Sequence, residues 1–170
     1  MFEEDILLGN TEESIVVQTR RGRDVLNVVE PEPGERGRRK YQILRERHPG
    51  WRPRKDACGV YNCYGMTFAS RRTSILADEF VSAILDDDGY RRVEERDAQV
   101  GDLAVYSDTR CGRLHVALIV QKEWVGETPV FFGLSKWDST SGEDIHRLSD
   151  HVWQDGDWQI VLEYYTDRTP

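Results

Sequence analysis

The first fifty residues alternate between short apolar runs and polar or structure-breaking residues. Two β-branched runs, at 14–18 and 24–29, flank an Arg-Arg-Gly-Arg stretch, and this pattern predicts a β-hairpin. The prolines and glycines between 31 and 37 predict a connection, and the basic stretch at 38–47 predicts a short helix that ends near Pro49. We therefore predict an N-terminal extension over residues 1–50.

Helical spacing of bulky residues begins after position 62. Asn62 is a good N-cap and predicts a helix over 63–69, with Cys63 in its first turn. A second helix is expected to begin with a cap at Thr73 or Ser74 and to stop at Gly89. The face of this second helix that we expect to be buried consists of Leu76, Phe80, Ala83, Ile84 and Asp87.

Beyond Tyr90 the pattern becomes that of strands, at 103–106, 113–121, 129–134 and 158–165. Helices followed by strands predict an α+β domain with an antiparallel sheet over residues 51–170. No apolar run approaches the roughly 18 residues that cross a bilayer. The acidic start lacks the basic and apolar regions of a secretory signal, so we expect a cytoplasmic protein, and signal-independent export would fit the same residues.

Charge is spread unevenly along the 170 residues. The chain has a formal net charge of −8, yet residues 36–55 carry nine Arg or Lys and the single acid Glu46. An acidic protein repels a long polyanion, so nucleic acid is not an expected main partner. The basic segment is interpreted either as a local anion site or as an internal counterweight to the acidic remainder.

Two residues suggest nucleophilic chemistry. His115 interrupts an apolar strand, where it is either a core histidine or a proton-transfer group. Cys63, at a predicted helix start, lies where the helix dipole and free amide groups favour a thiolate. A thiolate paired with an imidazole can attack a carbonyl carbon, with backbone N–H groups stabilising the oxyanion.

The order of three short motifs resembles the NlpC-type branch of the papain-like cysteine peptidases. Residues 62–66 read NCYGM, residues 101–106 read GDLAVY, and residues 115–120 read HVALIV. The family pattern is Asp-Cys-Ser-Gly-Leu-Val, Gly-Asp-Leu and His-Val-Gly-Ile, so Asn62, Tyr64 and Ala117 depart from it. The resemblance covers about residues 56–136. It implies helices packed on an antiparallel sheet, with Cys63 as nucleophile and His115 as general base and acid.

The resemblance also implies a third polar residue, and none of the family's usual His, Asn or Gln lies on the strand after His115. Ser135 is the nearest candidate, His146 the second, and a backbone carbonyl the third. The implied activity is hydrolysis or transfer at an amide or related acyl bond. The substrate would be a cell-wall peptide or a cytosolic protein conjugate, with no metal or organic cofactor and no membrane partner. The sequence does not indicate the oligomeric state.

Two further interpretations stay open. The three cysteines are expected to be free thiols, but Cys58, Cys63, Cys111 and His115 are also of the right types to hold a structural zinc ion. The domain would then be a zinc-stabilised or catalytically degenerate binding module, with the basic segment 36–55 recognising an anionic partner. Tyr61 could lend its hydroxyl to the Cys63 site or simply pack at the helix start.

Overall fold

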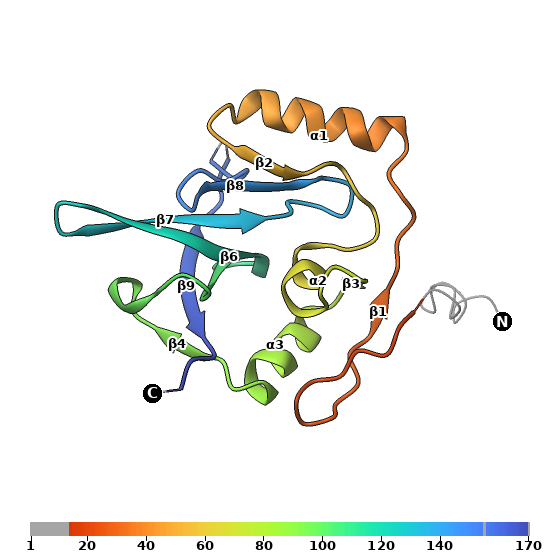
Figure 1. Cartoon of the computed structure of the whole chain (residues 1–170), viewed down its shortest axis with the longest axis horizontal. Helices are drawn as coiled ribbons and strands as arrows, with labels where there is room; N and C mark the ends of the chain where they lie inside the picture. The colour runs from red at the N-terminus through yellow and green to blue at the C-terminus, as the bar shows by residue number, and fades with distance from the viewer. Residues whose placement is uncertain (1–13, 155, 170) are drawn as a thin grey trace.

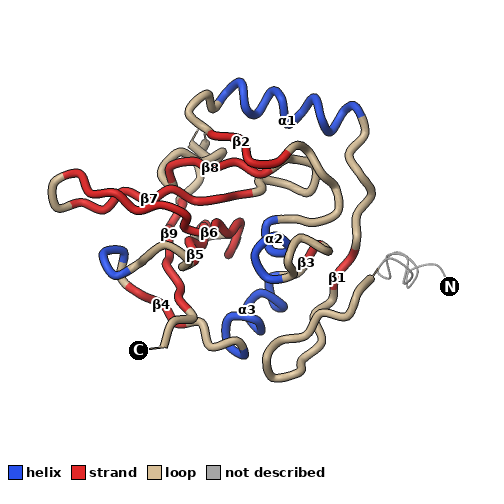
Figure 2. Tube along the Cα trace, in the orientation of Figure 1, coloured by secondary structure: helices blue, strands red, loops and turns tan. Residues whose placement is uncertain are grey.

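The structure, a computed structural model that describes residues 14–154 and 156–169, is an α+β fold around a seven-stranded antiparallel sheet (Figures 1 and 2). The strands lie in the order β2-β8-β7-β6-β5-β9-β4. Their bounds are Arg52–Lys55 for β2, Arg91–Val93 for β4, Leu103–Asp108 for β5, Gly112–Val125 for β6, Thr128–Ser135 for β7, Glu143–Arg147 for β8 and Ile160–Thr166 for β9. The predicted α+β class is confirmed.

The central strands have two buried sides. Because successive side chains of a strand point to opposite faces, Val116 packs against the helices α2 (Cys63–Phe68) and α3 (Asp78–Asp87), whereas Ala117 packs on the other face. The second face is covered by aromatic side chains that include Trp137 and Trp153. This explains why the predicted central strand is apolar in nearly every position. The four predicted strands correspond to β5, β6, β7 and β9.

The predicted helix that begins at Cys63 is confirmed, and the next predicted helix begins later than expected. Asn62 caps α2 by accepting a hydrogen bond from Gly65 N–H at 2.9 Å. The expected cap at Thr73 or Ser74 is wrong, because both side chains are buried beside the short strand β3 (Ser74–Ile75) and α3 begins after Ala77. Leu76 therefore precedes the helix and is 57% exposed, contrary to its expected burial. The stop is confirmed, since Gly89 follows α3 with a positive φ.

The N-terminal segment wraps around the helical side of the sheet (Figure 1). A bridge between Gln18 and Asp24 closes the predicted hairpin, and β1 (Asn27–Val28) pairs with β3. The turn of the hairpin is tied to the end of α3 by Thr19 Oγ1, which donates to Asp87 at 2.8 Å. Residues 1–13 of the predicted extension lie outside the described residues.

The predicted basic helix is present as α1 (Glu35–Arg47), which lies across the sheet edge formed by β2 and β8 (Figure 1). Its single buried side chain, Tyr41, donates a hydrogen bond to the buried Asp144 of β8 at 2.8 Å. This contact fixes the helix to the sheet. Within residues 14–154 and 156–169, no helix is long and apolar enough to cross a membrane.

Candidate active site

Cys63 is the first residue of α2, and local hydrogen bonds fix its position. Besides capping α2, the Asn62 amide donates to the Ile75 carbonyl at 2.6 Å and accepts from Ile75 N–H at 3.2 Å. One side chain therefore holds the start of α2 against β3. A helix start defined in this way leaves little freedom to the Cys63 backbone.

The Cys63 thiol lies in the core, against the sheet. Burial is the largest influence on it and raises its pKa to about 11, so the thiol is protonated at neutral pH. The backbone N–H groups of Val116, Tyr64 and Cys63 itself lower the pKa and so oppose this effect, as does the positive charge of Lys136. The sulfur thus lies in a nest of amides that would stabilise a thiolate, but in a site that excludes water.

His115 lies on β6 next to Val116, and its ring packs among the aromatic side chains of the opposite sheet face. The ring stacks on Trp137 with centroids 4.4 Å apart, and it also meets Tyr106 at 5.6 Å. Its Nε2 is buried without a hydrogen-bond partner, and burial together with the nearby His146 holds its pKa well below the usual range. His115 is therefore neutral at pH 7.

The two predicted catalytic residues meet through the backbone and not through their functional groups. Val116, whose N–H reaches the Cys63 sulfur, directly follows His115. The His115 Nε2 has no partner, so it does not hydrogen-bond to the thiol. The expected contact between thiol and imidazole is absent because the His115 ring points toward Trp137, while Val116 shares the Cys63 side.

The two candidates for the third residue, Ser135 and His146, contact each other. The hydroxyl of Ser135 lies 2.8 Å from His146 Nε2, and His146 Nδ1 lies 2.7 Å from the Arg147 carbonyl oxygen. Since a carbonyl only accepts, Nδ1 carries the hydrogen and Nε2 accepts from the Ser135 hydroxyl. The His146 ring also meets Trp137 at 4.7 Å. Ser135 therefore orients His146, and Trp137 contacts both His146 and the His115 ring.

Sequence reasoning missed two residues at this site, Trp137 and Lys136. Trp137 contacts both histidine rings, and its indole N–H is buried without a partner. Lys136 is fully buried, and its ammonium group donates to the backbone carbonyls of Cys58, Ser139 and Ser141. The sequence around Lys136 does not indicate that its side chain is buried, because the carbonyl groups that accept its hydrogen bonds come from two separate loops.

The other candidates have structural roles. The Tyr61 hydroxyl donates to Glu143 at 2.6 Å, and Arg71 bonds to both oxygens of the same carboxylate, so Tyr61 belongs to a buried polar network. The zinc interpretation is not supported. In the part of the chain that the structure describes, no group of three or more metal-ligating side chains forms, and Cys111 is exposed while Cys58 and Cys63 are buried.

The chain was compared with protein-family models, with curated proteins and with solved structures, and none of the three comparisons finds a match. Function has to be argued from the residues alone.

Proposed function

We propose that this protein is a thiol-dependent hydrolase or transferase acting on amide or related acyl bonds, in a papain-like arrangement of the NlpC type with Cys63 as nucleophile. The observation that carries the proposal is the packing of Cys63, the first residue of α2, in one buried cluster with Val116, the residue after His115. This position supports Cys63 as a nucleophile that lies close to the backbone of His115, with backbone amides around its sulfur.

The reaction forms and breaks two bonds in turn. The Cys63 thiol passes its proton to the His115 imidazole, and the sulfur bonds to the acyl carbon. His115 then protonates the departing amine as the carbon–nitrogen bond breaks. Water, deprotonated by His115, attacks the thioester and releases the acid and the free thiol. A second amine in place of water gives transfer.

The proposed proton transfer starts from a neutral thiol and a neutral imidazole. At rest the ring stacks on Trp137 and both partners are neutral, because burial raises the pKa of the thiol and lowers that of the imidazole. Because His115 and Val116 project to opposite faces of β6, direct proton transfer from the thiol requires a local change of the β6 backbone that brings the imidazole to the Cys63 side. The Ser135–His146 pair stays behind Trp137 and supports the site from the second face.

A burst experiment tests this function. An activated ester, p-nitrophenyl acetate, should release one equivalent of p-nitrophenol per chain as the acyl-enzyme forms. The Cys63→Ser variant should show no burst, and His115→Asn should slow it by roughly 10²-fold or more. Cys58→Ser, which changes the other buried cysteine, is the matched control and should keep the burst.

The exposed Cys111 is replaced by serine in the parent protein and in each variant of the burst experiment, because an accessible thiol could react directly with the ester. Circular dichroism confirms that each variant is folded. A full burst in folded Cys63→Ser would refute the assignment of the nucleophile, and a loss of less than about tenfold in His115→Asn would refute its role in proton transfer.

A further inference from the structure

The outer surface of α1 carries a groove that shares only Trp137 with the proposed active site. Three turns of the helix, with basic and apolar side chains, face the loops after β7 and β8 and line a hollow of about 530 Å³. We call it the α1 groove. It is lined by Arg36, Arg39, Lys40, Ile43, Leu44 and Arg47 of the helix, with Trp137, Asp138 and Val152 opposite.

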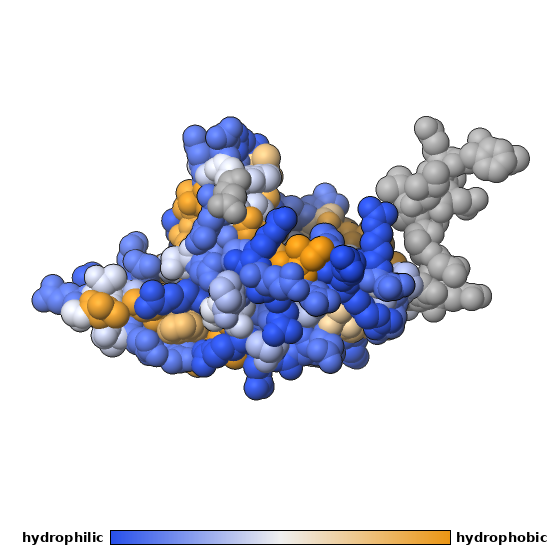
Figure 3. Space-filling view, turned by 90° about the horizontal axis from the view of Figure 1, so that it is seen from above, coloured by the Kyte–Doolittle hydropathy of each residue, from blue (hydrophilic) through white to orange (hydrophobic). Residues whose placement is uncertain are grey.

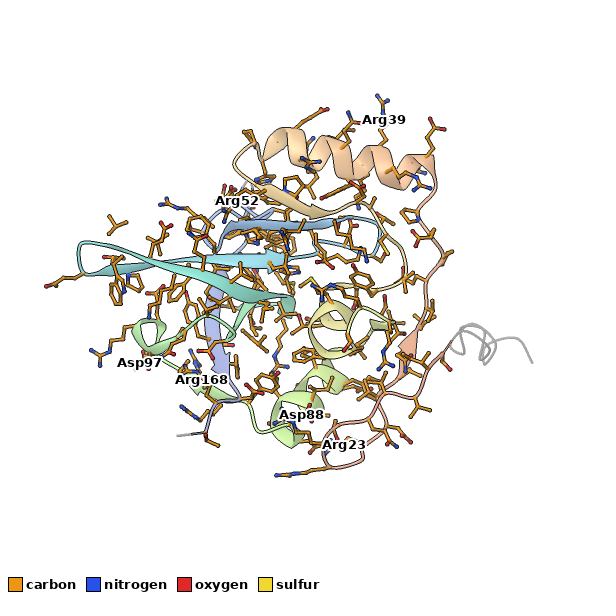
Figure 4. The ribbon with its side chains drawn as sticks, viewed as in Figure 1. Arg23, Arg39, Arg52, Asp88, Asp97 and Arg168 are labelled. Atoms are coloured by element: carbon orange, nitrogen blue, oxygen red, sulfur yellow. The ribbon has the colours of Figure 1, made fainter. Side chains whose placement is uncertain are left out.

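The positive charge of the groove is largely uncompensated. Lys40 is paired with Asp138 at 2.7 Å. Arg36, Arg39 and Arg47 are exposed and make no ion pair or side-chain hydrogen bond with any described residue. Arg39 projects outward from the helix (Figure 4). An internal counterweight would be paired with acidic side chains, so these three arginines favour the other interpretation of the basic segment, an anion site.

The floor of the groove is apolar. Ile43 is 41% exposed, and Leu44, Trp137 and Val152 are each partly buried along the same hollow. Seen from the side of α1, the surface shows small hydrophobic patches among hydrophilic side chains (Figure 3). A ligand that fits must therefore combine negative charge with an apolar group that leaves water on binding.

The groove is also held in shape before any ligand binds. The Tyr41 hydroxyl anchors α1 to Asp144, and the Lys40–Asp138 pair ties the helix to the loop opposite. A preformed site loses less conformational freedom on binding than a flexible one. The opposite side of the same helix differs, because the hollow beside Arg38 and Arg45 is lined by the acids Glu46 and Asp56.

We propose that the α1 groove binds an acidic peptide segment that carries a large apolar side chain. Its carboxylates would pair with Arg36, Arg39 and Arg47, and the apolar side chain would rest on Ile43 and Trp137. A peptide fits better than nucleic acid because the floor is mainly aliphatic and offers no row of aromatic rings for bases. The net charge of −8 would also repel a long polyanion.

Fluorescence anisotropy with a short labelled peptide built of glutamate and leucine tests the proposal. Arg39→Glu should weaken binding by at least about tenfold, because Arg39 lines the groove and its charge is unpaired among the described residues. Arg38→Glu is the matched control: it makes the same charge change at the neighbouring position, but on the other side of α1. It should weaken binding by less than about twofold. Ile43→Gln should weaken binding without altering the circular dichroism spectrum.

Two alternative probes separate this proposal from simple charge attraction. A peptide with serine in place of leucine should bind at least about tenfold more weakly, because it lacks the apolar anchor. Equal effects of Arg38→Glu and Arg39→Glu, or equal binding of the serine peptide, would overturn the proposal. Tighter binding of a labelled RNA oligomer or of anionic phospholipid vesicles than of the peptide would overturn it as well.

Discussion

Burial of His146 makes the stability of the fold depend on pH. The residue is 1% exposed, and burial lowers its pKa from 6.5 to about 4. The unfolded chain takes up this proton near pH 6.5 and the folded chain only near pH 4, so the unfolded state binds more protons between these values. The stabilisation is complete above pH 6.5 and is lost as the pH falls toward 4. The loss amounts to about 3 kcal/mol.

Urea unfolding between pH 7.5 and pH 4 measures this loss, and His146→Asn isolates it. Asparagine keeps a donor for the Arg147 carbonyl that His146 Nδ1 now contacts, but it cannot take up a proton. The variant should be less stable at pH 7 and should lose about 3 kcal/mol less than the protein that keeps His146 on acidification. His151, whose pKa is also lowered by burial, is present in both proteins, and His115, whose pKa the nearby His146 lowers further, is replaced by asparagine in both. Parallel pH profiles would refute the reasoning.

Two mutations test the packing around the site. Gly65→Ala should prevent stable folding, because the added Cβ would lie inside contact distance of the Thr73 carbonyl oxygen, whereas Gly50→Ala has open space around it and should leave the melting temperature nearly unchanged. Glu143→Gln should lower the free energy of unfolding by about 2 kcal/mol in urea titrations, because it removes the charge from the buried Tyr61 network. The exposed Glu79→Gln is its control, and equal losses in both variants would contradict the role of the network.

Local signals in the sequence were enough to predict the elements around Cys63. Asn62 as N-cap and Gly89 as stop act through backbone groups a few residues away, so their effect does not depend on the rest of the chain. The strand around Val116 was predicted because it is buried on both faces and is apolar throughout.

The strand β8 could not be predicted, because its polar residues find their partners far along the chain. Glu143 bonds to Tyr61, Asp144 to Tyr41 and His146 to Ser135. Without those partners, this segment has the composition of a loop. The failed cap at Ser74 has a similar cause, since pairing of β3 with β1 overrides the local preference of serine for a helix start.

At the candidate site, the sequence motifs predict the order of the helix and the strand but not the direction of the His115 ring. A motif fixes which residues are neighbours along the backbone, and the contact between the Cys63 sulfur and the Val116 N–H agrees with the expected order of helix and strand. The His115 ring points to the far face because successive strand side chains alternate between faces, and Trp137, which lies outside every motif, offers it a stacking surface there. A less bulky side chain at position 137 would remove that surface. Trp137→Ala should therefore free the His115 ring and change the rate of the p-nitrophenol burst, while a variant at the equally aromatic but distant Trp124 should not.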